Sequence, residues 1–324
     1  MAAEIQGSGL GVVRGLRHRE VWFDARASLP ELLRLRTADD VLLAAAVVDG
    51  VGHGRSALRR LASAARALDA GRFMRPGDGL EVSASFVGRR NYTRFDIEDA
   101  VGAELARPVR GAYHSRAGGR RPPAGARSWR VTIEGDRALI AVRATGRPLH
   151  RRAYKTSSIR GTLHPPVAAA MAGLARTAGL GAGELVLDPC CGAGTTLIEA
   201  RTLTRARLLG VDHDPAAILA ARANSGAASG GIGWGLADGG RLPVRDGSVA
   251  RVLVNPPWGR QVPPRGLLAA DGGRLWREVR RVLAPGGLAV ALVHDGIPDG
   301  FEPESTHPVS LSGLHPVIAV LKHS

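Results

Sequence analysis

The sequence predicts an α/β protein with two parts: a C-terminal half built on a doubly wound, mainly parallel sheet and an N-terminal half of smaller α+β units. From residue 184 onward, short apolar runs alternate with helical patterns, which is the order of a parallel sheet covered by helices. Before residue 148, strand and helix patterns form shorter groups with a hairpin signal. A chain of 324 residues is also long enough for two domains.

Residues 1–70 have the patterns of a small α/β unit. Ser28 and Glu31 have the spacing of a capping box, with Pro30 in the first turn, so a helix is expected to begin there. The other predicted elements are strands at 21–23 and 41–48 and a helix over 56–68.

Residues 71–147 have the patterns of a second unit of the same kind. Residues 115–127 are rich in Gly, Pro and Arg, which predicts a flexible basic loop. The predicted elements are an alternating strand at 80–86, a helix over 95–105 with acidic first turns, and a hairpin of strands 129–134 and 137–142.

Residues 148–165 form a basic connector, after which Pro165 and Pro166 open a helix. Strands and helices then alternate, and the last two strands follow each other directly, which predicts a closing antiparallel hairpin. The predicted strands are 184–188, 207–211, 231–237, 249–254, 288–294, 305–311 and 315–322, and the predicted helices are 195–204, 215–223 and 273–283.

The formal charge of +15 is concentrated in the first half of the chain. Residues 1–160 contain 29 Lys and Arg against 16 Asp and Glu, whereas residues 161–324 contain 15 against 13. A basic half joined to a nearly neutral half predicts a module that binds a polyanion, and nucleic acid is the expected partner.

Other features of the chain exclude several classes of protein. No run of 18 uncharged apolar residues is present, so we expect no membrane span, and the N-terminus lacks the pattern of a secretion signal. Cys190 and Cys191 are adjacent and too few for a disulfide framework or a zinc site, which fits a reducing cytoplasm. The histidines lack metal-ligand spacing, so no metal is expected.

A glycine-rich segment leads from the first strand of the C-terminal half into a helix. Gly192 and Gly194 have no Cβ and let the backbone pass close to a ligand. Asp188 offers a carboxylate that can attract an ammonium group. The candidate cofactor contacts in this segment are Asp188, Pro189, Cys190, Gly192, Gly194 and Thr195.

Acidic residues also end the next two predicted strands. Asp212 ends the second strand, where a carboxylate can bridge ribose hydroxyls, and Asp238 ends the third, where it can accept from an adenine amino group. NAD is disfavoured because the turn lacks the Gly-x-Gly-x-x-Gly spacing. Three acids at consecutive strand ends beside a glycine turn predict a site for a nucleoside-containing cofactor.

Asn255-Pro256-Pro257-Trp258 follows the strand at 249–254 and supplies a candidate acceptor site. The Asn255 amide oxygen and the Pro256 carbonyl can each accept an N–H of an exocyclic amine, and prolines add no donor. Trp258 can stack on a flat base. With the glycine turn, this loop predicts methyl transfer from S-adenosylmethionine to a planar amine, driven by alignment and matched charge rather than by a strong base. The candidate catalytic residues are Asn255, Pro256, Pro257 and Trp258.

These two motifs resemble those of class I methyltransferases that act on exocyclic amines. The connector, through residues 147–154 and 163–167, resembles the junction in THUMP-domain guanine-N2 RNA methyltransferases. Residues 94–98 and the hairpin at 129–142 look like the THUMP portion. The resemblance covers most of the chain and is specific in the catalytic half. The chain departs from the family pattern at Trp258, where Tyr or Phe is usual, and at Cys191.

The resemblance implies that the N-terminal half captures the tRNA acceptor stem while the C-terminal half makes N2-methylguanosine there, with S-adenosylmethionine as the methyl donor. By match to the motifs, Asp188, Gly192 and Gly194 would contact the cofactor, Asp212 its ribose and Asp238 its adenine, and Asn255 and Pro256 would bind the amine. We expect a monomer. The implied parts are a ferredoxin-like part at 1–70, a THUMP RNA-binding domain at 71–147, the connector at 148–165 and a Rossmann-like methyltransferase domain at 166–324.

Other substrates fit the same motifs. An rRNA guanine-N2 methyltransferase has the same fold and chemistry, and DNA adenine-N6 or protein glutamine methyltransferases present similar Asn-Pro-Pro-aromatic loops. The basic N-terminal half argues against a protein substrate, and the lack of a recognisable base-reading domain argues against DNA. A non-catalytic RNA-binding protein would have no need of the intact Asn255-Pro256-Pro257.

Overall fold

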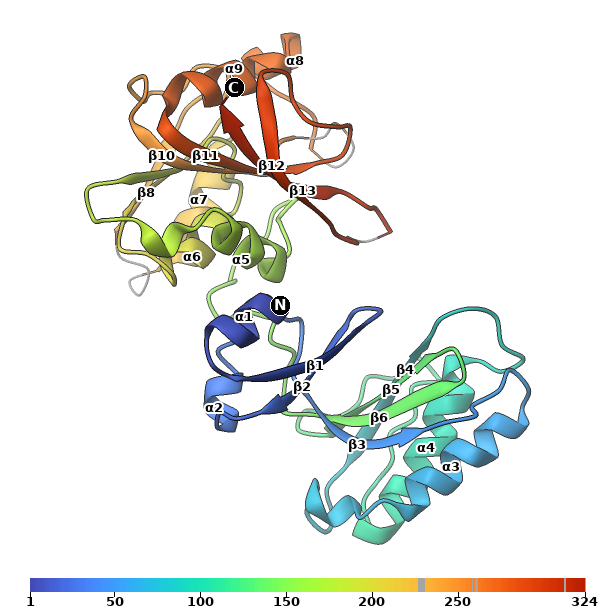
Figure 1. The fold of residues 1–324 in the computed structure, drawn as a ribbon. Helices are drawn as coiled ribbons and strands as arrows, with labels where there is room; N and C mark the ends of the chain where they lie inside the picture. The colour runs from blue at the N-terminus through green and yellow to red at the C-terminus, as the bar shows by residue number, and fades with distance from the viewer. Residues whose placement is uncertain (227–230, 258, 260–261, 312, 324) are drawn as a thin grey trace. The chain divides into compact units, whose positions relative to one another are not determined.

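The chain forms two compact units, Met1–Leu149 and His150–Ser324 (Figure 1). Among the helices of the described residues, none has both the length and the apolar character needed to cross a bilayer. The computed structural model describes residues 1–226, 231–257, 259, 262–311 and 313–323.

The C-terminal unit is built on one seven-stranded sheet. Its strands are β7 (Leu185–Asp188), β8 (Arg207–Asp212), β9 (Ile232–Leu236), β10 (Val249–Val254), β11 (Leu283–Val293), β12 (Phe301–Pro308) and β13 (Val317–His323). They lie in the order β12-β13-β11-β10-β7-β8-β9 (Figure 1).

Neighbouring residues of the central strands enter two different hydrophobic cores, one on each face of the sheet. Val186 packs with residues of α5 (Pro165–Leu174) and α6 (Thr195–Arg201), whereas Leu187 packs with residues of α9 (Gly273–Val282). Because side chains alternate along a strand, this division requires apolar residues at consecutive positions. Figure 1 shows α5 and α6 on one side of the sheet and α9 on the other. The unit also contains α7 (Pro215–Ser225) and α8 (Leu267–Ala270).

The strand order confirms the alternation predicted from residue 184 onward. The ladders from β9 through β8, β7 and β10 to β11 are all parallel. β13 runs antiparallel to both β11 and β12, so the closing hairpin is also confirmed. β11 begins earlier than the predicted residue 288, because Leu283 already pairs with Val249 before a register shift.

The N-terminal unit contains a four-stranded sheet and a separate two-stranded one. The four-stranded sheet has the order β3-β6-β5-β4, in which β4 and β5 are parallel and the other pairs are antiparallel. Its elements are β3 (Leu42–Val48), α3 (Ser56–Ala67), β4 (Leu80–Phe86), α4 (Arg94–Val109), β5 (Arg127–Glu134) and β6 (Arg137–Arg143).

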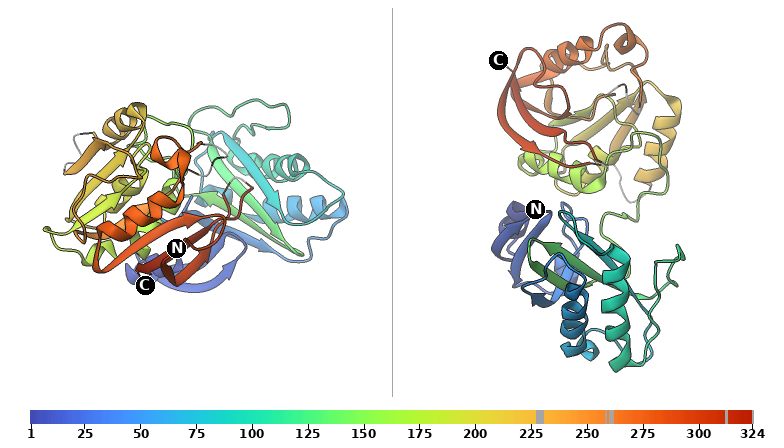
Figure 2. Two further views of the ribbon diagram at one scale, coloured as in Figure 1. Left: turned by 90° about the horizontal axis from the view of Figure 1, so that it is seen from above. Right: turned by 90° about the vertical axis from the view of Figure 1, so that its right-hand side faces the viewer.

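One hydrophobic core joins this four-stranded sheet to its two helices. Trp129 of β5, Leu61 of α3 and Ile97 of α4 are fully buried in it. Figure 2 shows α3 and α4 side by side along this sheet. The hairpin and helices predicted between residues 56 and 142 are therefore present.

A smaller core holds the first forty residues together. The antiparallel pair of β1 and β2 packs with two short helices around Ile5 and Leu35. The capping box at the start of the second helix is confirmed, since Glu31 accepts from the Ser28 N–H at 2.8 Å and from its hydroxyl. The elements are α1 (Ala2–Gly7), β1 (Gly11–Arg17), β2 (Glu20–Ala25) and α2 (Leu29–Leu32).

The division predicted at residue 70 falls inside the N-terminal unit. β3 precedes that residue but pairs along its whole length with β6, which follows it. The smaller core extends to Val41 and the larger one begins at Val48, so the packing favours a division near residue 41. The assignment of 71–147 to a THUMP domain remains a prediction. α1 and β1 were not predicted, because the Gly-rich start has no cap or alternation strong enough to indicate them.

Candidate active site

The loops that follow β7, β8 and β9 meet at one edge of the sheet, because parallel strands end on the same side. The Gly192 N–H donates to the Asp212 carboxylate at 2.9 Å. A Cβ placed on Gly239 would lie 3.1 Å from the Pro189 carbonyl oxygen, so the third loop lies against the first. The structure thus brings together the candidate cofactor residues of three strand ends.

Asp188 holds the first loop from inside the protein. Its side chain is buried, and its two carboxylate oxygens accept from the Cys190 N–H at 3.0 Å and from the Thr196 hydroxyl. Burial raises the pKa of Asp188 to about 7, and the nearby charge of Asp212 acts in the same direction. These contacts give Asp188 a part in shaping the turn, beside its predicted attraction for an ammonium group.

The two glycines of the turn have different surroundings. Gly194 has φ +80°, and a Cβ there would lie only 2.6 Å from the Trp234 ring and 3.1 Å from Ala221. Gly192 has φ +51°, and a Cβ there would meet only Ile159, at 3.9 Å. Gly194 is therefore needed for packing of the loop, whereas Gly192 leaves open space of the kind that lets a ligand approach the backbone.

The other candidate residues of the turn lie close to the protein interior. Thr195 is buried at the first position of α6. Pro189 is also buried, and Cys190 is half-buried. Burial raises the pKa of both Cys190 and Cys191 well above the usual thiol value, so both thiols stay protonated. In the part of the chain that the structure describes, no three His, Cys, Asp or Glu side chains gather as a metal site would require.

Asp212 joins the loops after β7 and β8. One carboxylate oxygen accepts from the Gly192 N–H, and the other accepts from the Asp214 N–H at 2.9 Å. A carboxylate has about four acceptor positions, so capacity for ribose hydroxyls remains. Asp214 itself caps α7 by accepting from the Ala216 N–H at 2.8 Å. Asp214 is thus engaged in capping the helix, and Asp212 remains the candidate ligand for the ribose.

Asp238 is held in a similar way at the start of the third loop. Its carboxylate accepts from the N–H groups of Gly240 and Leu267, each at 2.8 Å. The His213 ring lies 3.8 Å away. A Cβ on Gly266 would strike an Asp238 oxygen at 2.1 Å, so this position must be glycine for the loop to close.

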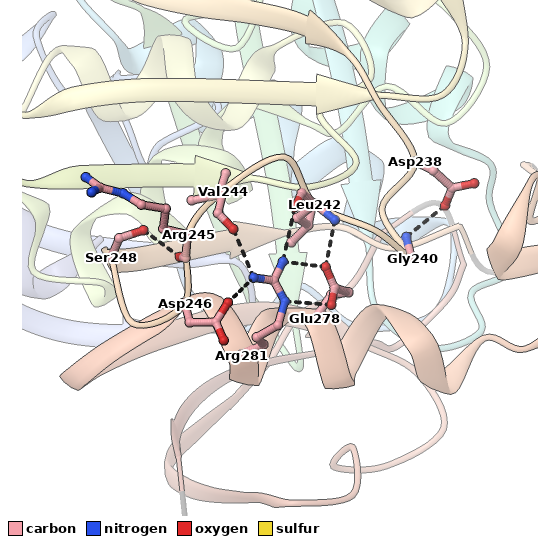
Figure 3. Close-up of polar contacts among 9 residues, drawn as sticks. All are labelled: Asp238, Gly240, Leu242, Val244, Arg245, Asp246, Ser248, Glu278 and Arg281. Carbon is pink, nitrogen blue, oxygen red and sulfur yellow. Dashed lines mark hydrogen bonds and ion pairs between the residues drawn. The ribbon is translucent and has the colours of Figure 1, made fainter.

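Arg281 of α9 fastens the segment that follows Asp238 (Figure 3). Its guanidinium donates to the carbonyl oxygens of Leu242 at 3.1 Å and Val244 at 2.9 Å. Glu278, one turn earlier in α9, accepts from Arg281 and from the Leu242 N–H at 2.7 Å. The bond from Arg281 lowers the pKa of Glu278, so this pair stays ionised near neutral pH. α9 therefore sets the path of the loop that begins at Asp238.

The candidate acceptor loop follows β10 at the same edge. β10 pairs with β7, whose end carries the glycine turn. Asn255 and Pro257 are half-buried, and Pro256 is buried. Trp258 lies outside the described residues, so its predicted stacking role has no structural account here.

The connector contains contacts that were not predicted. Glu199 of α6 is fully buried, and it accepts from Arg152 at 3.0 Å and from the Tyr154 hydroxyl at 2.8 Å. Asn224 of α7 accepts from the Ser157 N–H at 2.8 Å and donates to the Ala193 carbonyl in the glycine turn at 3.0 Å. The connector is thereby fastened to the turn. The sequence did contain one signal for this contact: Glu199 stands within the apolar stretch Leu197-Ile-Glu-Ala200, and an acid in such a stretch indicates a buried carboxylate with a partner.

The residues at this edge fit the expected cofactor, S-adenosylmethionine. Gly192 leaves space beside the turn, and two ionisable carboxylates with free acceptor capacity stand at the next two strand ends. Asp212 would hold ribose hydroxyls and Asp238 an adenine amino group.

Comparisons with known proteins point in the same direction. Residues 152–297 match the family model for the RMKL-like methyltransferase domain. The chain is 31% identical over 254 residues to a tRNA (guanine(6)-N2)-methyltransferase of Thermus thermophilus, and the match covers 75% of this chain and 72% of that protein.

Solved structures share the fold. The crystal structure of TrmN from Thermus thermophilus has a TM-score of 0.74 at 29% identity and covers 94% of this chain and 91% of its own. A methyltransferase crystallised with SAH has a TM-score of 0.75 at 15% identity, covers all of this chain and 94% of its own, and supports the fold alone.

The first prediction concerns Asp188 and pH. Because its folded-state pKa of about 7 lies above the ordinary value of 3.8, Asp188 contributes stability at low pH that is lost as pH rises through about 7. Between pH 5 and pH 8, the melting temperature of the wild type should fall by a few degrees relative to that of Asp188→Asn, which cannot ionise. Asp136→Asn, in an exposed turn, is the control and should follow the wild type. Parallel curves for all three proteins would contradict a raised pKa at Asp188.

The second prediction concerns the Glu278–Arg281 pair. Glu278→Ala removes an acceptor from Leu242 and from Arg281, so the loop at Asp238 should loosen and bind S-adenosylmethionine about five- to tenfold more weakly. Calorimetric titration measures this affinity directly. Arg277→Ala is the matched control, since Arg277 lies on the same helix in an exposed pair with Asp271. Equal affinities in both variants would show that α9 does not position this loop for the cofactor.

Proposed function

The chain belongs to the family of RNA guanine-N2 methyltransferases that contains the Thermus thermophilus enzyme, and we propose that it methylates N2 of a guanosine in the acceptor stem of tRNA. It is an enzyme that uses S-adenosylmethionine, and its product is N2-methylguanosine in tRNA. The observation that carries the proposal is the relationship to that enzyme over more than two thirds of both chains.

The chemistry follows from the groups at the sheet edge. S-adenosylmethionine supplies an electrophilic methyl group when it is bound. Asp212 would hold the ribose and Asp238 the adenine of the bound cofactor, and the open space at Gly192 would let it approach the turn. Asp188 keeps that turn in shape through the Cys190 N–H.

The acceptor loop orients the nucleophile. The exocyclic amine of guanine is a poor nucleophile, because its lone pair is delocalised into the ring. The Asn255 amide oxygen and the Pro256 carbonyl each accept one N–H, which directs the lone pair toward the methyl carbon. Pro257 keeps the loop free of a further donor, and the role proposed for Trp258, which lies outside the described residues, is to stack on the base. Methyl transfer would form a bond between the guanine nitrogen and the methyl carbon as the bond between that carbon and sulfur breaks, with the thioether as the leaving group and one amine proton passing to water.

Charge supports a division of labour between the units. Residues 1–149, the N-terminal unit, contain 25 Lys and Arg against 16 Asp and Glu, whereas the C-terminal unit contains 19 against 13, so the N-terminal unit, including the THUMP portion at 71–147, binds the RNA backbone. The protein acts as a monomer in the cytoplasm, where Cys190 and Cys191 remain reduced as free thiols.

The third prediction tests the function and the acceptor loop together. Wild-type protein incubated with labelled S-adenosylmethionine and total tRNA should give labelled N2-methylguanosine after digestion to nucleosides. Asn255→Ala should lower kcat by a factor of about 100 or more, because one acceptor of the amine is lost, while cofactor affinity by calorimetry stays within about threefold.

Two controls separate the possible outcomes. Asn91→Ala, an exposed change in the N-terminal unit, should leave kcat unchanged. Label found only in rRNA would support the rRNA enzyme instead, and label only in DNA adenine would refute guanosine as the substrate. Loss of cofactor binding in Asn255→Ala would move Asn255 out of the acceptor site.

A further inference from the structure

The N-terminal unit contains a hollow of about 420 Å³ at the start of its parallel strand pair. It lies between the segment that leads into β4 and the segment that leads into β5, because the Arg127 N–H donates to the Gly79 carbonyl at 2.8 Å. Its volume is within the range of sites that hold small molecules or single nucleotides. It belongs to the unit that does not contain the candidate active site.

Three arginines line this hollow. Arg72 and Arg75 come from the segment that leads into β4, and Arg127 begins β5. None of the three forms an ion pair with another described residue, unlike Arg66, which binds Glu104 at 2.9 Å in the same unit. Arginines without an ion-pair partner in one lining favour an anion beside them.

The single acid of the lining does not neutralise them. The Asp78 carboxylate accepts from the backbone N–H of Arg75 at 2.8 Å, which closes a tight turn. Three cationic side chains against one carboxylate leave the hollow with an excess of two positive charges. The expected ligand is therefore an anion.

Two apolar residues of the lining, Phe73 and Met74, are held by Trp129 of the core. Phe73 packs edge-on against Trp129, with ring centroids 5.6 Å apart. The buried Trp129 donates its indole N–H to the Met74 sulfur at 3.2 Å. A lining that combines an aromatic side chain with arginines suits a nucleotide, which has a flat base and a charged phosphate.

We propose that this hollow binds one nucleotide of the substrate RNA, with its phosphate held by Arg72, Arg75 and Arg127. The proposal rests on the proposed function only in taking RNA as the substrate. RNA is favoured over a small free anion because Arg127 of the hollow is also the last residue of the loop at 115–127. The exposed Arg120 and Arg121 of that loop extend the positive charge along the chain, as a polymer of phosphates requires.

The test is the affinity of the full-length protein for a tRNA transcript, measured by fluorescence anisotropy at several salt concentrations. Arg72→Ala, Arg75→Ala and Arg127→Ala should each weaken binding about fivefold near 0.1 M salt and lower the salt slope by about 0.7 to 0.9. Arg127→Lys keeps the charge but loses the planar fork, so it should keep the wild-type slope with weaker affinity.

Matched controls make the outcome decisive. Arg59→Ala removes the same charge from an exposed, unpaired arginine on α3 and should change the affinity less than twofold. Melting temperature and calorimetric binding of S-adenosylmethionine should be unchanged in every variant. Equal weakening by Arg59→Ala, or wild-type affinity in all three hollow variants, would overturn the proposal.

Turnover separates this proposal from the proposed function. In the hollow variants, KM for tRNA should rise as affinity falls, while kcat at saturating tRNA stays within about twofold. A wild-type protein that methylated no tRNA would contradict the proposed function, and the anisotropy series would still decide whether the hollow binds RNA. A fall in kcat with unchanged KM would contradict the hollow as a binding site.

Discussion

The carboxylate of Asp212 is the contact on which the arrangement of the loops at the candidate active site depends. It accepts one backbone N–H from the glycine turn after β7 and one from its own loop after β8. Parallel strands bring loop ends to one edge, but they do not set how those loops lie relative to each other. A charged acceptor shared by two loops does so, and charge-assisted hydrogen bonds of this kind are stronger than neutral ones.

Other contacts extend the same principle outward. The buried Asp188 accepts from a backbone N–H of the loop after β7. Arg281 and Glu278 of α9 form hydrogen bonds with backbone groups of the loop after β9. Each uses a side chain to satisfy backbone groups that no strand or helix satisfies. The loops at the edge are therefore held by polar contacts, while the strands behind them are held by two apolar cores.

The strands of the C-terminal sheet and the glycine turn at its edge could be predicted from the sequence, because both are marked by patterns of neighbouring residues. Apolar runs bounded by Gly, Pro or Asp marked the strands, and the motif at 188–195 marked the turn. Glu199 and Asn224 were missed because their partners lie 47 and about 68 positions away, beyond any local pattern. The pairing of β3 with β6, on the two sides of the boundary predicted at residue 70, also joins residues too far apart in the chain for a local pattern to indicate it. Burial of Asp188, which sets its pKa, also depends on tertiary packing and not on its motif.

The connector between the two units is short, and it is anchored within each of them. Leu149 packs on the core of the first forty residues, and Arg152 forms the buried pair with Glu199. Only His150 and Arg151 lie between these anchors. A short tether gives two linked modules a high effective concentration for each other, so under the proposed division of labour a polymer held by the N-terminal unit reaches the C-terminal unit in an intramolecular step.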